Sequence, residues 1–161
     1  MKRTVTALLL SLILTTAFAD EADEKKAVMD VLDAFFTGMT AKDIDGMQQI
    51  MTEDGVLYGY RETAEGPNVF SVTHAAYLEG LSAREGTPLE RIWNPEIQLH
   101  DRIAIVWTPY DFHSDGVFSH CGMNTFSMLK DSDGWKIAGV VFSVQAENCE
   151  ESPLGPLETT R

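Results

Sequence analysis

The residues in this sequence best suited to chemistry are a histidine and an asparagine within the otherwise apolar segment FSHCGMNTF. His120 and Asn124 stand where an ordinary core strand would carry only apolar side chains, so the segment predicts a place where a small molecule binds. A carboxylate beside His120 would fix the tautomer of the ring and raise its pKa, as a general base requires. A neighbouring tyrosine would instead suit hydrogen bonding to a ligand carbonyl.

The element that must position these side chains is a β-meander over residues 103 to 144. Three apolar and β-branched runs are separated by two turns, each of which reads Ser-Asp-Gly. Asp115-Gly116 and Asp133-Gly134 are dipeptides that supply the positive φ angles of tight hairpins. The sequence therefore predicts three consecutive antiparallel strands, with the polar segment on the middle one.

The first turn leaves two registers open. If Asp115-Gly116 is a two-residue turn, Asp111 faces His120 and Trp107 faces Asn124 on the same side of the sheet. If the loop has three residues and a bulge at Gly116, Tyr110 faces His120 instead. The first register makes His120 and Asp111 the candidate catalytic pair.

Aromatic and polar side chains near this pair are the candidate ligand contacts. They are Trp107, Tyr110, Asn124, Tyr58 and His74. For His74, which a helical pattern over residues 69 to 83 turns inward, a core histidine satisfied by a backbone carbonyl is the favoured interpretation. If His120 has no role in a site, the chemistry is to be sought at His74, Tyr58 or His113.

The remaining pattern is helical at first and then mixed. An apolar stripe predicts an amphipathic helix from Glu21 to about Met39, and Asp43 is the expected N-cap of a short second helix. Residues 56 to 60 alternate as a strand, with Tyr58 and Tyr60 on one face. Residues 89 to 99 predict a further strand that Pro95 interrupts.

The first 19 residues have the features of a secretory signal peptide, with Lys2 and Arg3, an apolar run and Ala17-Phe18-Ala19 before Asp20. Cleavage there predicts a periplasmic or secreted protein with one domain over residues 20–149 and a flexible acidic tail over residues 150–161. It would remove two of the 12 basic residues, against 25 acidic ones, and make the net charge about −15. This charge argues against nucleic acid and, after cleavage, membranes as partners.

Two cysteines, Cys121 and Cys149, are present. In an exported chain they predict a disulfide that closes a loop of about 28 residues. Metal binding is the rival use, but no Cys-x-x-Cys or Cys/His spacing supports it. Nucleotide-binding glycine motifs and a Gly-x-Ser-x-Gly motif are also missing from the sequence, so neither a metal nor a cofactor is expected.

Two longer segments resemble the nuclear transport factor 2-like superfamily, which includes SnoaL-like cyclases, ketosteroid isomerase and scytalone dehydratase. AFFTGMTAKDIDGMQQIMTEDGVLYGY is similar to the first helix, helix junction and first strand of that superfamily, and DSDGWKIAGVVFSV to its closing hairpin and last strand. The resemblance implies an α+β cone, in which a strongly bent sheet wraps around N-terminal helices and leaves a pocket at its open end.

Such a cone hosts several functions, so function has to be argued from the site. Three remain open here: an exported protein that binds a small apolar or aromatic molecule, a lyase, isomerase or hydrolase of the SnoaL-like type, and a non-catalytic module that forms a homodimer through the exposed face of the sheet. We favour small-molecule binding.

Overall fold

The computed structural model describes residues 6–157, with side chains from residue 21 onward. A long helix α1 (Thr6–Ala41) and a short helix α2 (Ile44–Ile50) come first. A hairpin and helix α3 (His74–Ala83) follow, and the strands after α3 complete the sheet. The strands are β1 (Met51–Thr63), β2 (Gly66–Thr73), β3 (Pro88–Ile92), β4 (Glu96–His100), β5 (Ile103–Ser114), β6 (Val117–Lys130) and β7 (Trp135–Val144).

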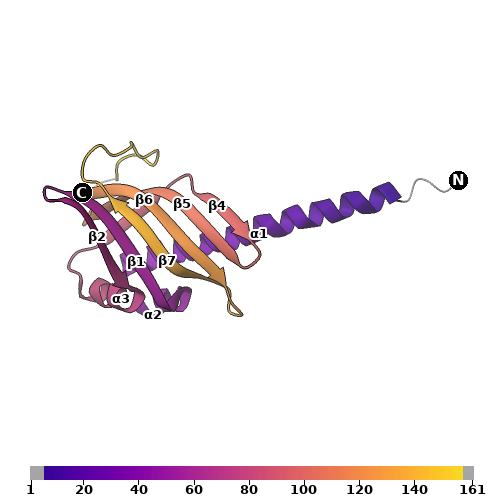
Figure 1. Ribbon diagram of the computed structural model, residues 1–161, viewed down its shortest axis with the longest axis horizontal. Helices are drawn as coiled ribbons and strands as arrows, with labels where there is room; N and C mark the ends of the chain where they lie inside the picture. The colour runs from indigo at the N-terminus through magenta and orange to yellow at the C-terminus, as the bar shows by residue number, and fades with distance from the viewer. Residues whose placement is uncertain (1–5, 158–161) are drawn as a thin grey trace.

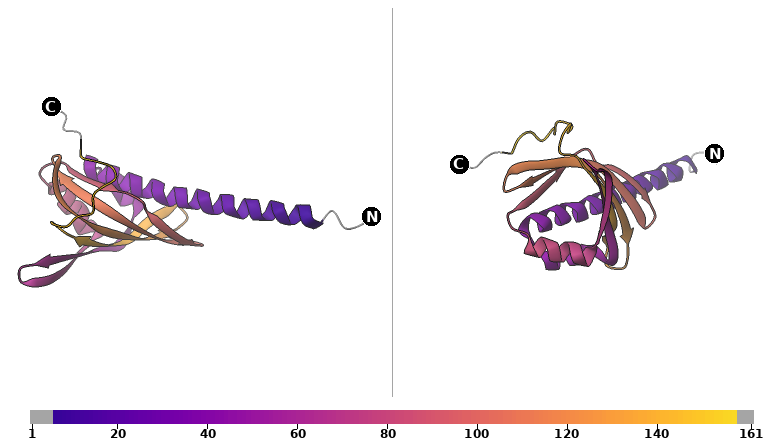
Figure 2. Two further views of the ribbon diagram at one scale, coloured as in Figure 1. Left: turned by 90° about the horizontal axis from the view of Figure 1, so that it is seen from above. Right: turned by 60° about the vertical axis from the view of Figure 1, so that its left-hand side comes forward.

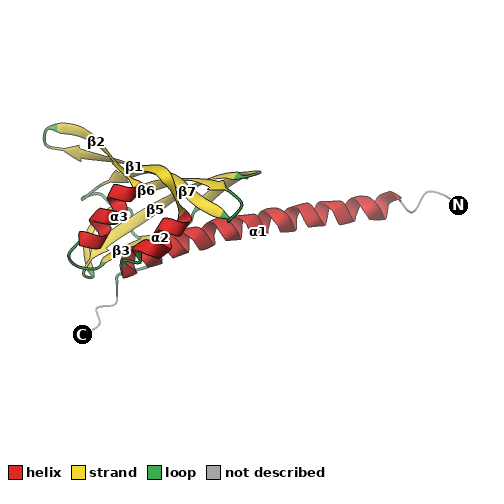
Figure 3. Ribbon diagram, turned by 90° about the horizontal axis from the view of Figure 1, so that it is seen from below, coloured by secondary structure: helices red, strands yellow, loops and turns green. Residues whose placement is uncertain are grey.

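The strands form one strongly bent sheet in the order β2-β1-β7-β6-β5-β3, and β4 also pairs with β5. β1 and β7 are parallel, whereas the other pairs are antiparallel. The sheet curls around the C-terminal half of α1, and the N-terminal half of this helix extends beyond it (Figures 1 and 2). Figure 3 shows α2 and α3 together at one end of the sheet. The predicted α+β cone is confirmed.

An apolar stripe fixes α1 in the curl of the sheet. Leu32, Phe35 and Phe36 are buried, and the rings of both phenylalanines contact Phe126 of β6 at centroid distances of 5.9 and 5.8 Å. Each such side chain contributes about 1.5–3 kcal/mol when it is removed from water. At the other end of the stripe, Glu24 accepts a 2.8 Å hydrogen bond from the indole of Trp135.

Several local predictions are confirmed. Asp43 caps α2 by accepting a hydrogen bond from the backbone N–H of Gly46, and residues 103 to 144 form three consecutive strands. Asp115 and Gly116 both have positive φ angles, 53° and 78°. The second turn differs, because Asp131 N–H donates to Gly134 O across a longer loop in which Gly134, but not Asp133, has a positive φ.

The predicted helix over residues 69 to 83 is wrong in its first part. Residues 66–73 form β2, which pairs with β1 through a tight hairpin. Phe70 and Val72 fit the two-residue period of a strand, and pairing with β1 makes this segment a strand rather than part of the helix. The helix begins at His74, where Thr73 accepts a hydrogen bond from Ala76 N–H.

Residues 89 to 99 form two strands rather than one interrupted strand, because β3 and β4 pair with different parts of β5. The predicted signal peptide and domain boundaries stay predictions. Residues 1–5 and 158–161 lie outside the described residues, and residues 6–19 belong to α1. Within residues 6–157, no helix has both the length and the apolar character to cross a membrane. Gly155 of the predicted tail accepts a hydrogen bond from Arg91, so this part of the tail contacts the sheet.

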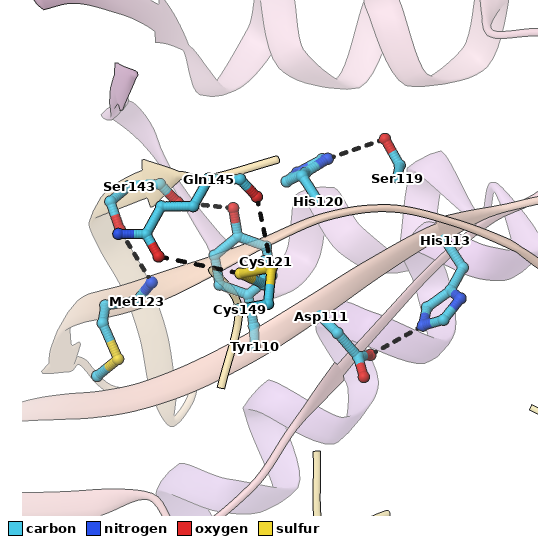
Figure 4. The surroundings of a disulfide bond; sticks show 10 residues. All are labelled: Tyr110, Asp111, His113, Ser119, His120, Cys121, Met123, Ser143, Gln145 and Cys149. Carbon is cyan, nitrogen blue, oxygen red and sulfur yellow. Dashed lines mark hydrogen bonds and ion pairs between the residues drawn. A yellow bond between two sulfur atoms is a disulfide. The ribbon is translucent and has the colours of Figure 1, made fainter. Parts of the chain in front are cut away.

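The predicted disulfide between Cys121 and Cys149 is confirmed. It joins β6 to the segment that follows β7 (Figure 4), and two backbone hydrogen bonds between Cys121 and Gln145 lie beside it. The bond closes a loop with a sequence separation of 28 residues.

Replacing both cysteines, Cys121→Ala with Cys149→Ala, is expected to lower the free energy of unfolding by about 3 kcal/mol, because the unfolded chain regains the entropy of the open loop. Urea denaturation measures this. Dithiothreitol should lower the stability of the unmodified protein by a similar amount and leave the double variant unchanged. Equal stability of the unmodified protein and the double variant, each with and without dithiothreitol, would contradict the prediction.

Candidate functional site

A cavity of about 250 Å³, here called the cone cavity, lies between α1 and the concave face of the sheet. Most of its wall is aromatic or apolar. These side chains include Phe35, Met39, Tyr77, Phe126, Val140 and Phe142. Tyr77 stacks on Phe35 at a centroid distance of 6.0 Å. Such a wall suits the flat face of an aromatic molecule.

A carboxyl and an amide meet in this wall. Glu90 comes from β3 and Asn124 from β6, and both point to the concave side because their partners on the intervening strand β5 are the inward-facing Phe112 and Thr108. Asn124 Nδ2 donates a 2.7 Å hydrogen bond to Glu90 Oε1. Burial raises the pKa of Glu90 to about 7, although this hydrogen bond acts in the opposite direction. Glu90 can therefore accept or donate a proton near neutral pH.

His120 lies in the same cavity. Its ring stacks on Phe112 at a centroid distance of 4.8 Å and meets Tyr110 edge-on at 5.8 Å. Nδ1 lies 3.0 Å from the hydroxyl of Ser119 (Figure 4). Burial lowers the pKa of His120, and the positive charges of Arg61 and Arg84 lower it further. The imidazole is consequently neutral at neutral pH.

Tyr110 is held rigidly at the edge of the cavity. Its hydroxyl donates a 2.8 Å hydrogen bond to Ser143 O, and its ring covers Gly122 on the neighbouring strand (Figure 4). A Cβ atom at position 122 would lie 1.9 Å from that same Ser143 oxygen, so only glycine fits. Since its proton is used within the protein, Tyr110 offers a ligand its ring rather than its hydroxyl.

Neither predicted register around His120 is correct. Ser114 faces Val117, as a two-residue turn requires, but a bulge between Phe112 and His113 then shifts the pairing by one residue. His120 therefore faces Phe112, while Asp111 faces Cys121 on the opposite side of the sheet. A shift of one residue moves a side chain to the other face of a sheet, and for this reason the predicted pair of Asp111 and His120 does not form.

Asp111 belongs to another group of polar residues, the Asp111 cluster, which comprises Arg91, Asp111 and His113. Arg91 donates to Asp111 at 2.8 Å through Nε and at 2.5 Å through Nη2. His113 Nε2 lies 3.2 Å from Asp111 Oδ1 (Figure 4). This cluster lies on the outer side of the sheet beneath the segment from Cys149 to Leu157, so it is separate from the cone cavity.

Three other predicted ligand contacts also lie elsewhere. Tyr58 and Trp107 point to the outer face and are 49% and 47% exposed, and Trp107 faces Thr125 rather than Asn124. His74 is buried at the start of α3, where Nδ1 donates a 2.7 Å hydrogen bond to Thr52 O. It is the core histidine that was favoured. Of the predicted site residues, His120, Tyr110 and Asn124 come together in the cone cavity.

Sequence reasoning missed Glu90. The available signal was the strand PLERI, in which Pro88, Glu90 and Ile92 share the inward face by alternation. The partner of Glu90, Asn124, is 34 residues away in the chain. Among the described residues, no group of three His, Cys, Asp or Glu side chains is arranged to hold a metal ion.

A protein-family model described as "Putative lumazine-binding" matches residues 23–143. The chain belongs to this family. The match spans the elements that build the cone cavity, from α1 to β7. No curated protein matches the chain by sequence.

Solved structures share the fold of this family member. A nuclear transport factor 2-like superfamily protein from Salmonella enterica serovar Typhimurium aligns with a TM-score of 0.63 and 13% identity, over 84% of this chain and 99% of that one. A protein of unknown function with a cystatin-like fold, from Nostoc punctiforme, aligns with a TM-score of 0.60 and 14% identity, over 81% of this chain and 95% of that one. A "putative dehydratase" from Streptomyces avermitilis aligns with a TM-score of 0.61 and 16% identity, over 78% of this chain and 97% of that one. These structures confirm the predicted nuclear transport factor 2-like fold.

Glu90 is expected to make stability depend on pH in a particular direction. Its pKa of about 7 in the folded protein exceeds the ordinary 4.5, so the folded state binds this proton more tightly, and its contribution to stability falls as the pH rises from about 4.5 to 7. As the pH rises from 4.5 to 8, the free energy of unfolding of Glu90→Gln should therefore increase by roughly 3 kcal/mol relative to that of the unmodified protein.

Chemical denaturation across this pH range measures the difference. The control is Glu85→Gln, since Glu85 is exposed and its replacement should leave the pH profile unchanged. Parallel profiles for Glu90→Gln and the unmodified protein would contradict an elevated pKa.

Proposed function

We propose that this protein binds a small, partly apolar molecule in the cone cavity. The observation that carries the proposal is the Asn124–Glu90 hydrogen bond, which places a carboxyl and an amide within an aromatic wall. Burying such groups costs stability that an apolar pair would not cost. Binding of a ligand to these two residues accounts for their presence in the cavity wall. The description of the family, which names a small-molecule ligand, supports the same conclusion.

The two residues offer a ligand complementary groups. Asn124 uses one of its N–H donors on Glu90 and has a further donor and an acceptor. Glu90 can accept a hydrogen bond as a carboxylate or donate one as an acid, because its pKa is about 7. A heteroaromatic edge with both donors and acceptors would match them, while Tyr77, Tyr110 and Phe126 contact its faces.

Catalysis is the second candidate function, and one observation favours it. A carboxyl with a pKa of about 7 and a neutral histidine line the same cavity, and a proton-transfer step requires groups of this kind. The acid–base pair of a lyase, isomerase or hydrolase would then be Glu90 and His120, in place of His120 and Asp111. The dehydratase description of the Streptomyces avermitilis structure agrees with this candidate.

The outer face of the sheet supports a third, smaller proposal, a homodimer. Tyr58, Val141, Thr125 and Trp107 stand side by side across β1, β7, β6 and β5, and the three apolar members of this row are about half exposed. A second copy of the chain would cover it. We also propose that the protein acts in the periplasm or outside the cell, where a disulfide is stable.

Binding in the cone cavity is tested with N-phenyl-1-naphthylamine, a neutral aromatic probe, added to ¹⁵N-labelled protein. Saturable shifts are expected at Glu90, Asn124 and Tyr110, and Asn124→Leu should weaken binding at least fivefold because it removes the polar edge. Trp107→Gln is the control and should bind as the unmodified protein does. Shifts confined to the outer face, around Trp107 and Val141, would contradict the proposal.

Binder and enzyme are separated by the fate of the natural ligand. A molecule that co-purifies with the protein and is released unchanged after incubation at pH 7 supports binding alone. A molecule that is released chemically altered, and is released unaltered from Glu90→Gln, supports catalysis.

A further inference from the structure

Two arginines line the cone cavity together with Glu90 and His120. Arg61 lies on β1 and Arg84 directly follows α3. The guanidinium of Arg61 lies 5.1 Å from the ring centroid of Phe70, and that of Arg84 lies 5.3 Å from that of Phe112. Both rings belong to the cavity wall. The two cationic groups are therefore held against this wall by cation–π contacts.

Among the described side chains, residues 21–157, neither arginine forms an ion pair, although the protein is markedly acidic. The chain has 25 acidic residues and 12 lysines and arginines. Arg91 forms a close ion pair with Asp111, but within the part of the chain that the structure describes, no carboxylate lies within 4.0 Å of a side-chain nitrogen of Arg61 or Arg84. Two guanidinium groups thus remain available to an anion from solution.

Both charges act on the interior of the cavity. Each of them lowers the pKa of His120, and they also act separately on two tyrosines of the cavity, Arg61 on the buried Tyr110 and Arg84 on the partly buried Tyr77. Arg61 and Arg84 are exposed residues, whereas Asn124 is only 3% exposed. The cavity is therefore cationic where it meets solvent and carries its carboxyl and amide in its depth.

We propose that the ligand of the cone cavity is an aromatic anion, with a carboxylate, sulfonate or phosphate group bound by Arg61 and Arg84. Its ring lies against the aromatic wall, and its far end, which carries an N–H or O–H donor, meets Glu90 and Asn124. Guanidinium groups suit this role because their planar forks bind such oxygens through paired hydrogen bonds. The inference rests on the proposed function of the cavity and names the class of molecule that the cavity selects.

The experiment compares two fluorescent probes on the full chain. 8-Anilinonaphthalene-1-sulfonate and N-phenyl-1-naphthylamine have the same ring system and differ by the sulfonate. The sulfonate probe is expected to bind at least tenfold more tightly at low salt. Arg61→Gln and Arg84→Gln should each raise its dissociation constant about five- to tenfold and change that of the neutral probe less than twofold.

Matched variants separate charge from folding. Arg102→Gln removes an exposed arginine that does not line the cone cavity and should change neither constant. Arg61→Lys keeps the charge and should retain most of the affinity for the sulfonate probe. Thermal melting of each variant shows whether it is folded, and the unmodified protein should lose affinity for the sulfonate probe, but not for the neutral one, in 0.5 M NaCl.

The outcomes also distinguish this inference from the proposed function. Equal affinity for the two probes, or an equal loss with Arg102→Gln, would overturn the role of Arg61 and Arg84 while leaving the cavity as a binding site. Failure of both probes to bind in the cavity would overturn the proposed function and this inference with it. Selective loss of the sulfonate probe in the two cavity variants supports the inference.

Discussion

The bulge in the pairing of β5 with β6, between Phe112 and His113, is the constraint on which the chemistry of this protein depends. Side chains alternate between the two faces of a sheet, so a shift of one residue reassigns every side chain beyond it. Here the shift turns His120 inward against Phe112 and leaves Asp111 outside beside Arg91. One irregularity thus places His120 and Asp111 on opposite faces of the sheet.

The carboxyl that does share a cavity with His120 comes from a third strand. Glu90 reaches the concave face from β3 and is held by Asn124 of β6, across the intervening β5. Burying this pair opposes folding, whereas the apolar stripe of α1 and the Cys121–Cys149 disulfide favour it. The cone therefore combines a stable frame with a polar pair whose burial opposes folding, and the binding function proposed above rests on this pair.

The sequence predicted the elements of this frame more accurately than the faces of its strands. Asp115-Gly116 marks a turn through its positive φ angles, but the bulge that follows it has no comparable compositional signal, so the register could not be derived. Their aromatic character makes Tyr58 and Trp107 candidates for the pocket, although their alternation with the buried Leu57 and Val106 places them on the outer face. When one face of a strand is buried and the other carries aromatic side chains, residue types alone do not indicate which face points inward.

Glu90 shows a different limit of sequence reasoning. Alternation in the short strand PLERI places Glu90 on the inward face, but its importance comes from a partner 34 residues away, which PLERI alone does not indicate. A histidine is a candidate site residue in any sequence, whereas residue type alone does not distinguish one glutamate from the other members of a set of 25 acidic residues. The same applies to Arg61 and Arg84, whose common cavity exists only because β1 and the end of α3 meet at the concave side of the sheet.

The most direct test of Glu90 as a ligand-binding carboxyl is ¹³C NMR titration of its side chain, assigned by comparison with Glu90→Gln, in the presence and absence of 8-anilinonaphthalene-1-sulfonate. We predict titration near pH 7 in the free protein and a clear shift of this resonance when the probe binds. A carboxyl that titrates near the ordinary value of 4.5 and does not respond to a saturating probe would contradict both the elevated pKa of Glu90 and its role in binding.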